Sequence, residues 1–161
     1  MTALSLVHTM RAVRMHATGG PEVLTVETIP VPQPDRGEAL VRIEAAGVNF
    51  IDVYKRAGLY RLPLPATIGE EGAGTVVAVG EAVSEVRVGG RVAWATVLGA
   101  YAEFAVVPAT KLVMLPDAVS ARVGAAVMLQ RVGAEFALAD VANAHRALEG
   151  RRTTGKVLLQ R

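Results

Sequence analysis

Asn49 and Asp52 are the polar pair whose types and spacing could serve chemistry. They stand three residues apart at the start of a predicted short helix, residues 49–57, so their side chains share one face. Tyr54 and Tyr60 follow closely, and the four residues could form a polar constellation at the rim of a site. A structural role also explains the pair, because Asn49 suits a helix N-cap and Asp52 complements the helix dipole. Spacing alone favours this structural role, since capping accounts for both residues.

Two glycine-rich segments match nucleotide-binding loops only in part. Residues 150–156 fit G-x-x-x-x-G-K, but a predicted helix precedes them, a predicted strand follows, and Val157 occupies the Ser/Thr position that would bind magnesium. Residues 69–74 lead into a strand, which indicates a close approach between strands. Glu70 and Glu71 are adjacent there, so they are expected to face apart rather than act as paired acid and base. No G-x-G-x-x-G occurs in the chain.

The composition excludes several classes of protein. With 161 residues and no cysteine, the chain has no disulfide framework, thiolate zinc site, iron–sulfur cluster or cysteine nucleophile, and its three histidines are far apart. The 17 basic and 15 acidic residues are interspersed, so no nucleic-acid partner is expected. Apolar runs are too short for a transmembrane helix, and residues 1–9 lack the basic start of a signal peptide. We therefore expect a disordered leader at residues 1–9, no membrane partner and a cytoplasmic location.

Short alternating strands separated by Gly and Pro must position these residues. Residues 39–46 alternate between apolar and charged side chains, and residues 75–79 form a β-branched run. Residues 91–98 and 101–107 flank a short connection and are predicted to pair as a β-hairpin. Further strands are predicted at 11–16, 24–29 and 156–160. Many short strands with glycine turns indicate a barrel or a sandwich.

Few helices are predicted. Asn49 begins the first helix and Gly58 ends it. A second helix is capped by Ser120, and its apolar stripe comprises Ala121, Ala125, Met128 and Leu129. A third spans residues 138–149, with inward-facing Val141, Ala144 and Leu148. His145 is expected to be solvated and Trp94 to be buried. The fold class is therefore mainly β with a few helices, in one domain.

A series of short strings in a fixed order carries a resemblance to a known family. The most specific string, residues 47–52, reads Gly-Val-Asn-Phe-Ile-Asp. The others lie at residues 19–24, 57–60, 68–74, 88–92, 99–103, 136–140, 144–149 and 154–157. Together they resemble the zeta-crystallin-type quinone oxidoreductases of the medium-chain dehydrogenase/reductase superfamily. The resemblance covers nearly all of residues 10–161.

The resemblance implies a GroES-like barrel, the catalytic domain of these enzymes, interrupted in the family by a Rossmann domain that holds NADPH. In this chain the helix ending at Gln130 passes directly to Arg131, so the nucleotide-binding insertion is missing between segments 10–130 and 131–161. The lack of G-x-G-x-x-G and of alternating βα units agrees with this interpretation. Because both barrel segments are intact at a clean join, engineering explains the missing insertion better than gene-level deletion.

The implied activity is the reduction of a quinone by NADPH without zinc. In zinc-dependent members of the superfamily, the zinc ligands Cys and His stand at the positions that match Asn49 and Glu70. This sequence therefore has neither of those zinc ligands. The resemblance assigns catalytic and cofactor-binding roles at the nicotinamide to Asn49, Asp52 and Tyr54. Asn49 and Tyr54 would orient the ring or the carboxamide, and Asp52 would hold them in place. Tyr60, with Tyr54, would border the quinone substrate.

The missing insertion predicts that this chain by itself has almost no catalytic activity. Most contacts to NADPH would be lost, so the chain is expected to bind no cofactor by itself and to turn over weakly or not at all. Loss of the domain would also expose an apolar face around Val127, Met128 and Leu129, which predicts self-association. The alternative function is a non-catalytic GroES-like binding or scaffold module, which the missing insertion favours and the retained polar residues oppose. A co-chaperonin subunit fits less well, because such subunits are shorter and use a mobile loop.

Overall fold

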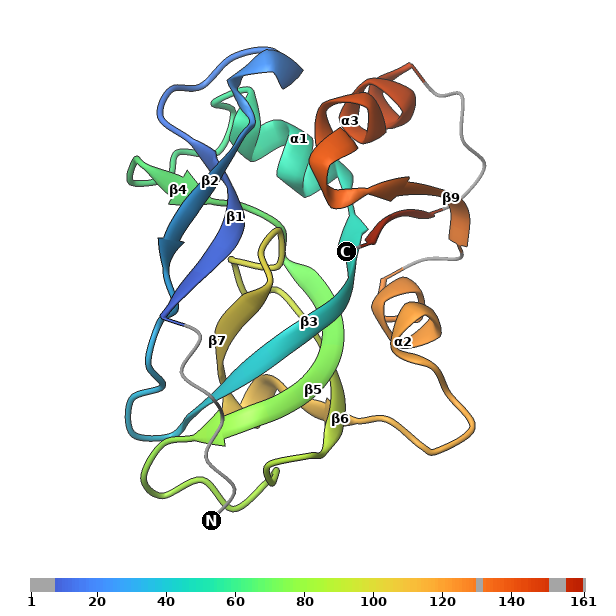
Figure 1. Cartoon of the computed structure of the whole chain (residues 1–161). Coiled ribbons are helices and arrows are strands. Elements are labelled where there is room, and N and C mark those ends of the chain that lie inside the picture. The colour runs from blue at the N-terminus through green and yellow to red at the C-terminus, as the bar shows by residue number, and fades with distance from the viewer. Residues whose placement is uncertain (1–7, 130–131, 151–155, 161) are drawn as a thin grey trace.

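The computed structural model describes residues 8–129, 132–150 and 156–160, whose strands form two sheets (Figure 1). The smaller sheet has the order β2-β1-β4, and its strands are β1 (Thr9–Met15), β2 (Thr25–Pro30) and β4 (Ala66–Thr67). The larger sheet has the order β8-β6-β5-β3-β10-β9, and β7 also pairs with β3. Its strands are β3 (Glu38–Val48), β5 (Glu71–Val79), β6 (Arg91–Ala95), β7 (Phe104–Pro108), β8 (Val113–Met114), β9 (Val132–Ala137) and β10 (Lys156–Gln160). The mainly β fold class is confirmed.

β3 is the central strand and leads the chain to the predicted site. It is antiparallel to β5, β7 and β10. Val41 and Ile43 enter the hydrophobic core, whereas Arg42 and Glu44 are exposed, as the alternating pattern predicts. β5 lies so close to β3 that a Cβ atom at Gly74 would overlap the Arg42 carbonyl oxygen. The glycines at the start of β5 therefore permit a close approach between strands, as the sequence indicated.

The predicted β-hairpin of residues 91–98 and 101–107 is wrong. β6 pairs with β5, where Trp94 lies opposite Gly72, and β7 pairs with β3 instead. Between the two strands, the backbone N–H groups of Ala100 and Tyr101 donate to the carbonyl oxygens just before β5, at 3.0 and 3.1 Å. The connection is therefore a crossover. Trp94 is buried, as predicted, and a Cβ atom at Gly72 would lie 2.6 Å from its ring.

Three α-helices pack on these sheets: α1 (Phe50–Arg56), α2 (Ala121–Val127) and α3 (Val141–Glu149). Three short 3-10 turns are η1 (Pro21–Val23), η2 (Ala109–Lys111) and η3 (Leu138–Asp140). The inward residues predicted for α3 are buried. Ser120 caps α2 by accepting the Val123 N–H at 3.3 Å. Leu129 was predicted to continue the apolar stripe of this helix, but α2 ends at Val127, so Leu129 lies beyond the helix and is exposed. No helix in the described part of the chain is long and apolar enough to cross a membrane.

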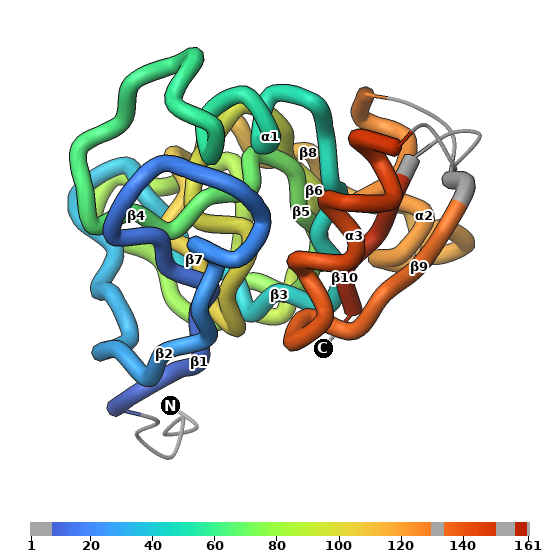
Figure 2. Tube along the Cα trace, turned by 90° about the horizontal axis from the view of Figure 1, so that it is seen from above, coloured from blue at the N-terminus to red at the C-terminus, as the bar shows by residue number. Residues whose placement is uncertain are grey.

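The C-terminal segment extends the larger sheet beside the predicted site. β10 is antiparallel to β3 and parallel to β9, and α3 lies beside α1 (Figure 1). Seen from above, this segment and the β1–β2 pair occupy opposite sides of the molecule (Figure 2). Thr9 belongs to β1, and the His8 carbonyl oxygen accepts the Val31 N–H at 3.0 Å, so these two residues of the predicted leader are ordered; residues 1–7 lie outside the described part. The division at residues 130 and 131 stays a prediction.

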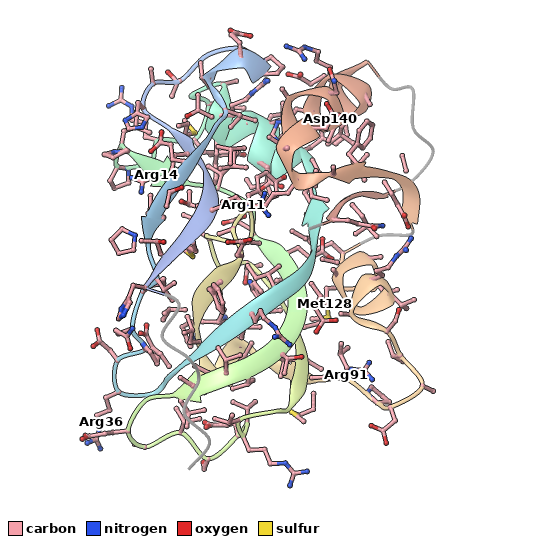
Figure 3. The ribbon with its side chains drawn as sticks, viewed as in Figure 1. Arg11, Arg14, Arg36, Arg91, Met128 and Asp140 are labelled. Atoms are coloured by element: carbon pink, nitrogen blue, oxygen red, sulfur yellow. The ribbon has the colours of Figure 1, made fainter. Side chains whose placement is uncertain are left out.

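The face predicted around the end of α2 is exposed at two of its three positions. Val127 and Leu129 are 60% and 48% exposed, whereas Met128 packs partly against the core (Figure 3). We expect self-association through this face, with an apparent mass that rises with protein concentration in sedimentation. Val127→Ser should weaken it by about tenfold, because each copy would bury less apolar surface. Val26→Ser, on exposed β2, is the control; a monomer at every concentration would contradict the prediction.

Candidate functional site

Asn49 lies where β3 passes into α1, and it is the N-cap residue of that helix. Its side-chain Nδ2 donates to Oε2 of Glu71, the first residue of β5, at 2.9 Å. The strand register explains this contact, since Glu71 pairs with Gly47, two residues before Asn49. A Cβ atom at Gly47 would overlap the Glu71 carboxylate and lie 2.9 Å from the Ala125 carbonyl oxygen. The missing side chain at Gly47 therefore leaves the space in which Glu71 reaches Asn49.

Asp52 is fully buried on the inner face of α1. Its Oδ2 accepts the backbone N–H of Asn49 at 2.8 Å and the hydroxyl of Tyr101 at 3.0 Å. Burial raises the pKa of Asp52 from its ordinary 3.8 to about 7, although the Asn49 and Tyr101 hydrogen bonds act in the opposite direction. Asn49 and Asp52 therefore have the structural role that their spacing favours. Asp52 stabilises the N-terminus of α1, and the hydrogen bond to Glu71 holds the Asn49 side-chain amide.

Tyr101 and His145 complete a buried polar cluster behind Asp52. Both are fully buried, and the Tyr101 hydroxyl lies 3.5 Å from His145 Nε2 with the rings edge to face. Burial and the neighbouring Asp52 carboxylate raise the pKa of Tyr101. Burial lowers the pKa of His145 to about 3, and the nearby Arg56 charge adds to this effect. The prediction of a solvated His145 is wrong, because α3 turns this residue toward α1.

Three exposed aromatic rings form a row on the outer side of α1 and the loop after it. The ring centroids of Phe50 and Tyr54 are 6.1 Å apart, and those of Tyr54 and Tyr60 are also 6.1 Å apart. Helical spacing places Phe50 and Tyr54 on the face opposite Asp52, so they remain 41% and 40% exposed. Phe50 is the first residue of α1 and directly follows the N-cap Asn49, so the aromatic row begins at the end of the helix that Asn49 caps. The row offers flat apolar faces and two phenol hydroxyls to a ligand.

The cations of α1 are engaged by acidic side chains. Lys55 forms an ion pair with Glu70, and Arg56 forms one with Glu149 of α3. Glu70 and Glu71 therefore have different partners and do not act as a paired acid and base. Among the residues described, no group of three His, Cys, Asp or Glu side chains could hold a metal ion. These residues suit a flat ring with amide or carbonyl groups better than a phosphate chain.

The structure brings only some of the predicted site residues together. Asn49, Tyr54 and Tyr60 lie along the accessible side of α1, whereas Asp52 lies on its buried side. Sequence reasoning missed the partners that hold them, Glu71 and Tyr101. The glycine at position 47 is the one local signal for Glu71, and it becomes informative only once the β3–β5 register is known.

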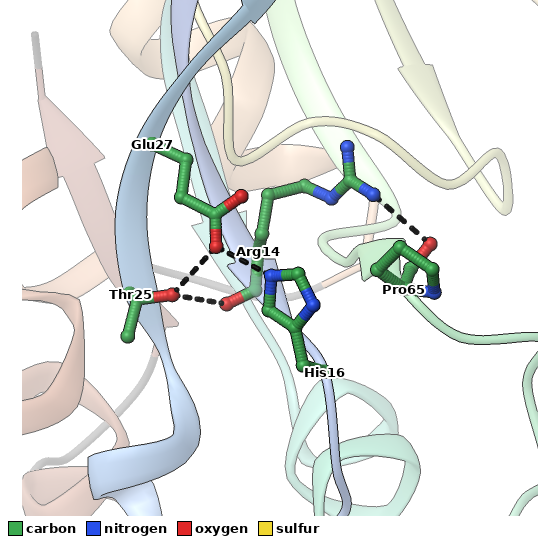
Figure 4. A network of polar contacts seen from close by, with 5 residues as sticks. All are labelled: Arg14, His16, Thr25, Glu27 and Pro65. Carbon is green, nitrogen blue, oxygen red and sulfur yellow. Dashed lines mark hydrogen bonds and ion pairs between the residues drawn. The ribbon is translucent and has the colours of Figure 1, made fainter.

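Two other features lie apart from this site. An exposed network joins β1 and β2, where His16 Nε2 lies 2.6 Å from Glu27 Oε1 and the Arg14 guanidinium donates to the Pro65 carbonyl at 3.2 Å (Figure 4). The hydrogen bond with His16 lowers the pKa of Glu27. An apolar pocket between β1, β2 and β7 is lined by residues such as Met10 and Phe104, and by none of the predicted site residues.

Comparison with known proteins gives a consistent family. The family model of the alcohol dehydrogenase GroES-like domain matches residues 35–117. A quinone oxidoreductase of Pseudomonas aeruginosa is 46% identical over 130 residues, which are 80% of this chain and 40% of that protein. The crystal structure of a Pseudomonas syringae quinone oxidoreductase superposes with a TM-score of 0.73 at 46% identity, covering 74% of this chain and 38% of that one.

A solved Escherichia coli quinone oxidoreductase, in complex with NADPH, has a TM-score of 0.72 and 40% identity, covering 74% of this chain and 37% of that one. The chain thus spans about two fifths of the length of the curated relatives it matches.

Proposed function

Because the chain belongs to the alcohol dehydrogenase GroES-like domain family, we propose that it is the catalytic domain of a zinc-independent, NADPH-dependent quinone oxidoreductase. The relatives named quinone oxidoreductase support the reaction, and the Escherichia coli complex supports the cofactor. Zinc independence is supported by Asn49 and Glu70, which are engaged with Glu71 and Lys55 rather than arranged with further metal-ligand side chains.

One observation carries the proposal: buried Glu71 holds the Asn49 amide at the N-cap of α1, the helix that bears two rings of the exposed aromatic row. An amide in a fixed orientation can recognise a carboxamide or carbonyl group, and the phenol faces can pack on a flat ring. We assign the nicotinamide to Asn49 and Tyr54, and the quinone to Tyr60 together with Tyr54. When bound, NADPH supplies the reducing equivalents.

Asp52 acts from inside the protein in this proposal. Asp52 is fully buried, so its carboxylate does not touch the ligand. It acts on the site through the hydrogen bond that it accepts from the Asn49 backbone N–H. Fixing the N-cap of α1 keeps the Asn49 side chain and Tyr54 in a constant relation. The chain's own contribution is thus to orient two rings and to provide one wall of the site that excludes water.

These 161 residues alone should hold NADPH weakly, because the residues assigned to the site would contact only the nicotinamide ring of the cofactor. We expect a dissociation constant of about 1 mM or weaker, and quinone turnover too slow to detect. Amide shift perturbation in NMR can measure such weak binding. With NADPH, the signals of Asn49, Phe50, Tyr54 and Tyr60 should move saturably.

Asn49→Ala should weaken NADPH binding by about fivefold, which corresponds to one hydrogen bond. Asn143→Ala is the matched control, because Asn143 is an exposed asparagine on α3 bonded only to its helix neighbours Asp140 and Arg146 in the contacts seen. Perturbations away from the aromatic row, or equal binding by both variants, would contradict the proposed site.

A further inference from the structure

A buried chain of hydrogen-bonding groups links the C-terminal helix to the N-cap of α1. It runs from His145 on α3, through the Tyr101 hydroxyl, to Asp52 Oδ2 and on to the Asn49 backbone N–H. The successive distances are 3.5, 3.0 and 2.8 Å. These groups come from three parts of the chain that are distant in sequence, and only Asn49 reaches the surface.

We propose that Tyr101 is a positioning residue for Asn49 and that His145 of α3 holds the Tyr101 ring in place. This inference rests on the proposed function, because it assigns a purpose to the orientation of Asn49. Tyr101 reaches the site through Asp52 alone, so it touches neither ring of the ligands.

The geometry supports positioning rather than simple packing. Asp52 Oδ2 is shared by two donors, one that begins α1 and one that projects from the crossover before β7. The Tyr101 backbone is itself anchored, because its N–H donates to the Ile68 carbonyl oxygen at 3.1 Å. Its ring has no freedom to follow α1, since the Gly69 backbone lies directly against it. A fixed hydroxyl therefore sets where Asp52, and with it Asn49, can lie.

A second contact, an ion pair, joins α3 to α1 on the same side. Arg56, whose side chain is 2% exposed, forms an ion pair with Glu149 one turn beyond His145. The charged and titratable groups of Asp52 and its surroundings are Lys55 and Arg56 of α1, Glu70 and Glu71 at the start of β5, Tyr101 before β7, and His145 and Glu149 of α3. Any shift of α3 would reach Asn49 through these two links.

The test follows the Asn49 backbone amide by NMR while pH is varied. This amide donates to Asp52, so its chemical shift reports the protonation of that carboxyl, with a midpoint near the Asp52 pKa of about 7. Tyr101→Phe keeps the ring but removes the donor that stabilises the ionised carboxylate. We expect the midpoint to rise by about one pH unit and NADPH binding to weaken by about three- to tenfold.

Val53→Ala is the matched control, because it loosens the packing of α1 and removes no hydrogen bond of the cluster. It should lower stability and leave the midpoint unchanged. An unchanged midpoint in Tyr101→Phe, or an equal shift in Val53→Ala, would overturn the inference. If NADPH moves only signals away from the aromatic row but the midpoint shifts as stated, the proposed function fails and the positioning link stands.

The wild-type chain provides a second measurement that needs no variant at position 101. A buried, bonded Tyr101 hydroxyl should give a proton signal protected from exchange, and this signal should titrate with the same midpoint as the Asn49 amide. His145→Leu should shift this signal, because the hydroxyl loses its contact with Nε2, and His145→Gln, whose amide can meet the hydroxyl, should move it back toward the wild-type position. A rapidly exchanging hydroxyl in wild type would overturn the inference.

Discussion

Asp52→Asn is expected to make the free energy of unfolding rise with pH, by about 1.4 kcal/mol per pH unit between about pH 4.5 and about pH 6. His145→Gln should give a slope of similar size and opposite sign. The wild-type chain should show almost no pH dependence in this window. Urea unfolding at several pH values measures all three.

The signs follow from the two buried groups. The pKa of Asp52 rises from 3.8 to about 7 on folding, so between these values the folded chain holds a proton that the unfolded chain has lost. Its contribution therefore falls as pH rises. The pKa of His145 falls from 6.5 to about 3, so the unfolded chain holds the extra proton and this contribution rises with pH. In the shared window the two slopes cancel in the wild-type chain. Each substitution removes one titrating group, so the variant shows the slope of the group that remains.

Asp117→Asn is the control for the loss of a carboxylate, because Asp117 is exposed in the segment between β8 and α2. It should leave the flat profile intact. Parallel profiles for wild type, Asp52→Asn and His145→Gln would show that neither group changes its protonation on folding, and the account of the buried cluster would be wrong.

Local patterns in the sequence were sufficient for most elements. Alternation along residues 39–46 predicted β3, although its ends extend to Glu38 and Val48. Asn49 and Gly58 bounded α1 correctly, because a cap and a positive φ, here 88° at Gly58, are local requirements of the backbone. Residues 75–79 predicted only the second half of β5, since its glycine-rich start has no β-branched residues and depends on close contact with β3.

Partners far apart in the chain explain what the sequence did not reveal. The β6–β7 hairpin was wrong because pairing depends on register with β5 and β3, which local turn signals do not encode. His145 reads as a polar residue on a short helix, and only its neighbours Tyr101 and Arg56 make it buried and neutral. Asp52 was found, but its burial depends on Tyr101, which is 49 residues away.

Gly69→Ala is expected to destabilise the chain by roughly 2–5 kcal/mol, through a position that contacts Tyr101 rather than the ligand. Gly69 has φ of 90°, where an alanine side chain is strained by about 1–2 kcal/mol. Its Cβ atom would also overlap the Tyr101 ring, which is fully buried and cannot move outward. Overpacking of this kind adds about 1–3 kcal/mol.

Gly89→Ala separates these two causes. Gly89 has φ of 85°, but nothing lies within 4 Å of a Cβ atom built there, so this variant should pay only for the backbone conformation, about 1–2 kcal/mol. Denaturant unfolding of both variants gives the difference. Because Gly69→Ala displaces the ring whose hydroxyl holds Asp52, it should also move the pH midpoint of the Asn49 amide, which Gly89→Ala should not. Equal destabilisation by the two substitutions, with the midpoint unmoved in both, would mean that Tyr101 yields to the new methyl group and does not fix Asp52.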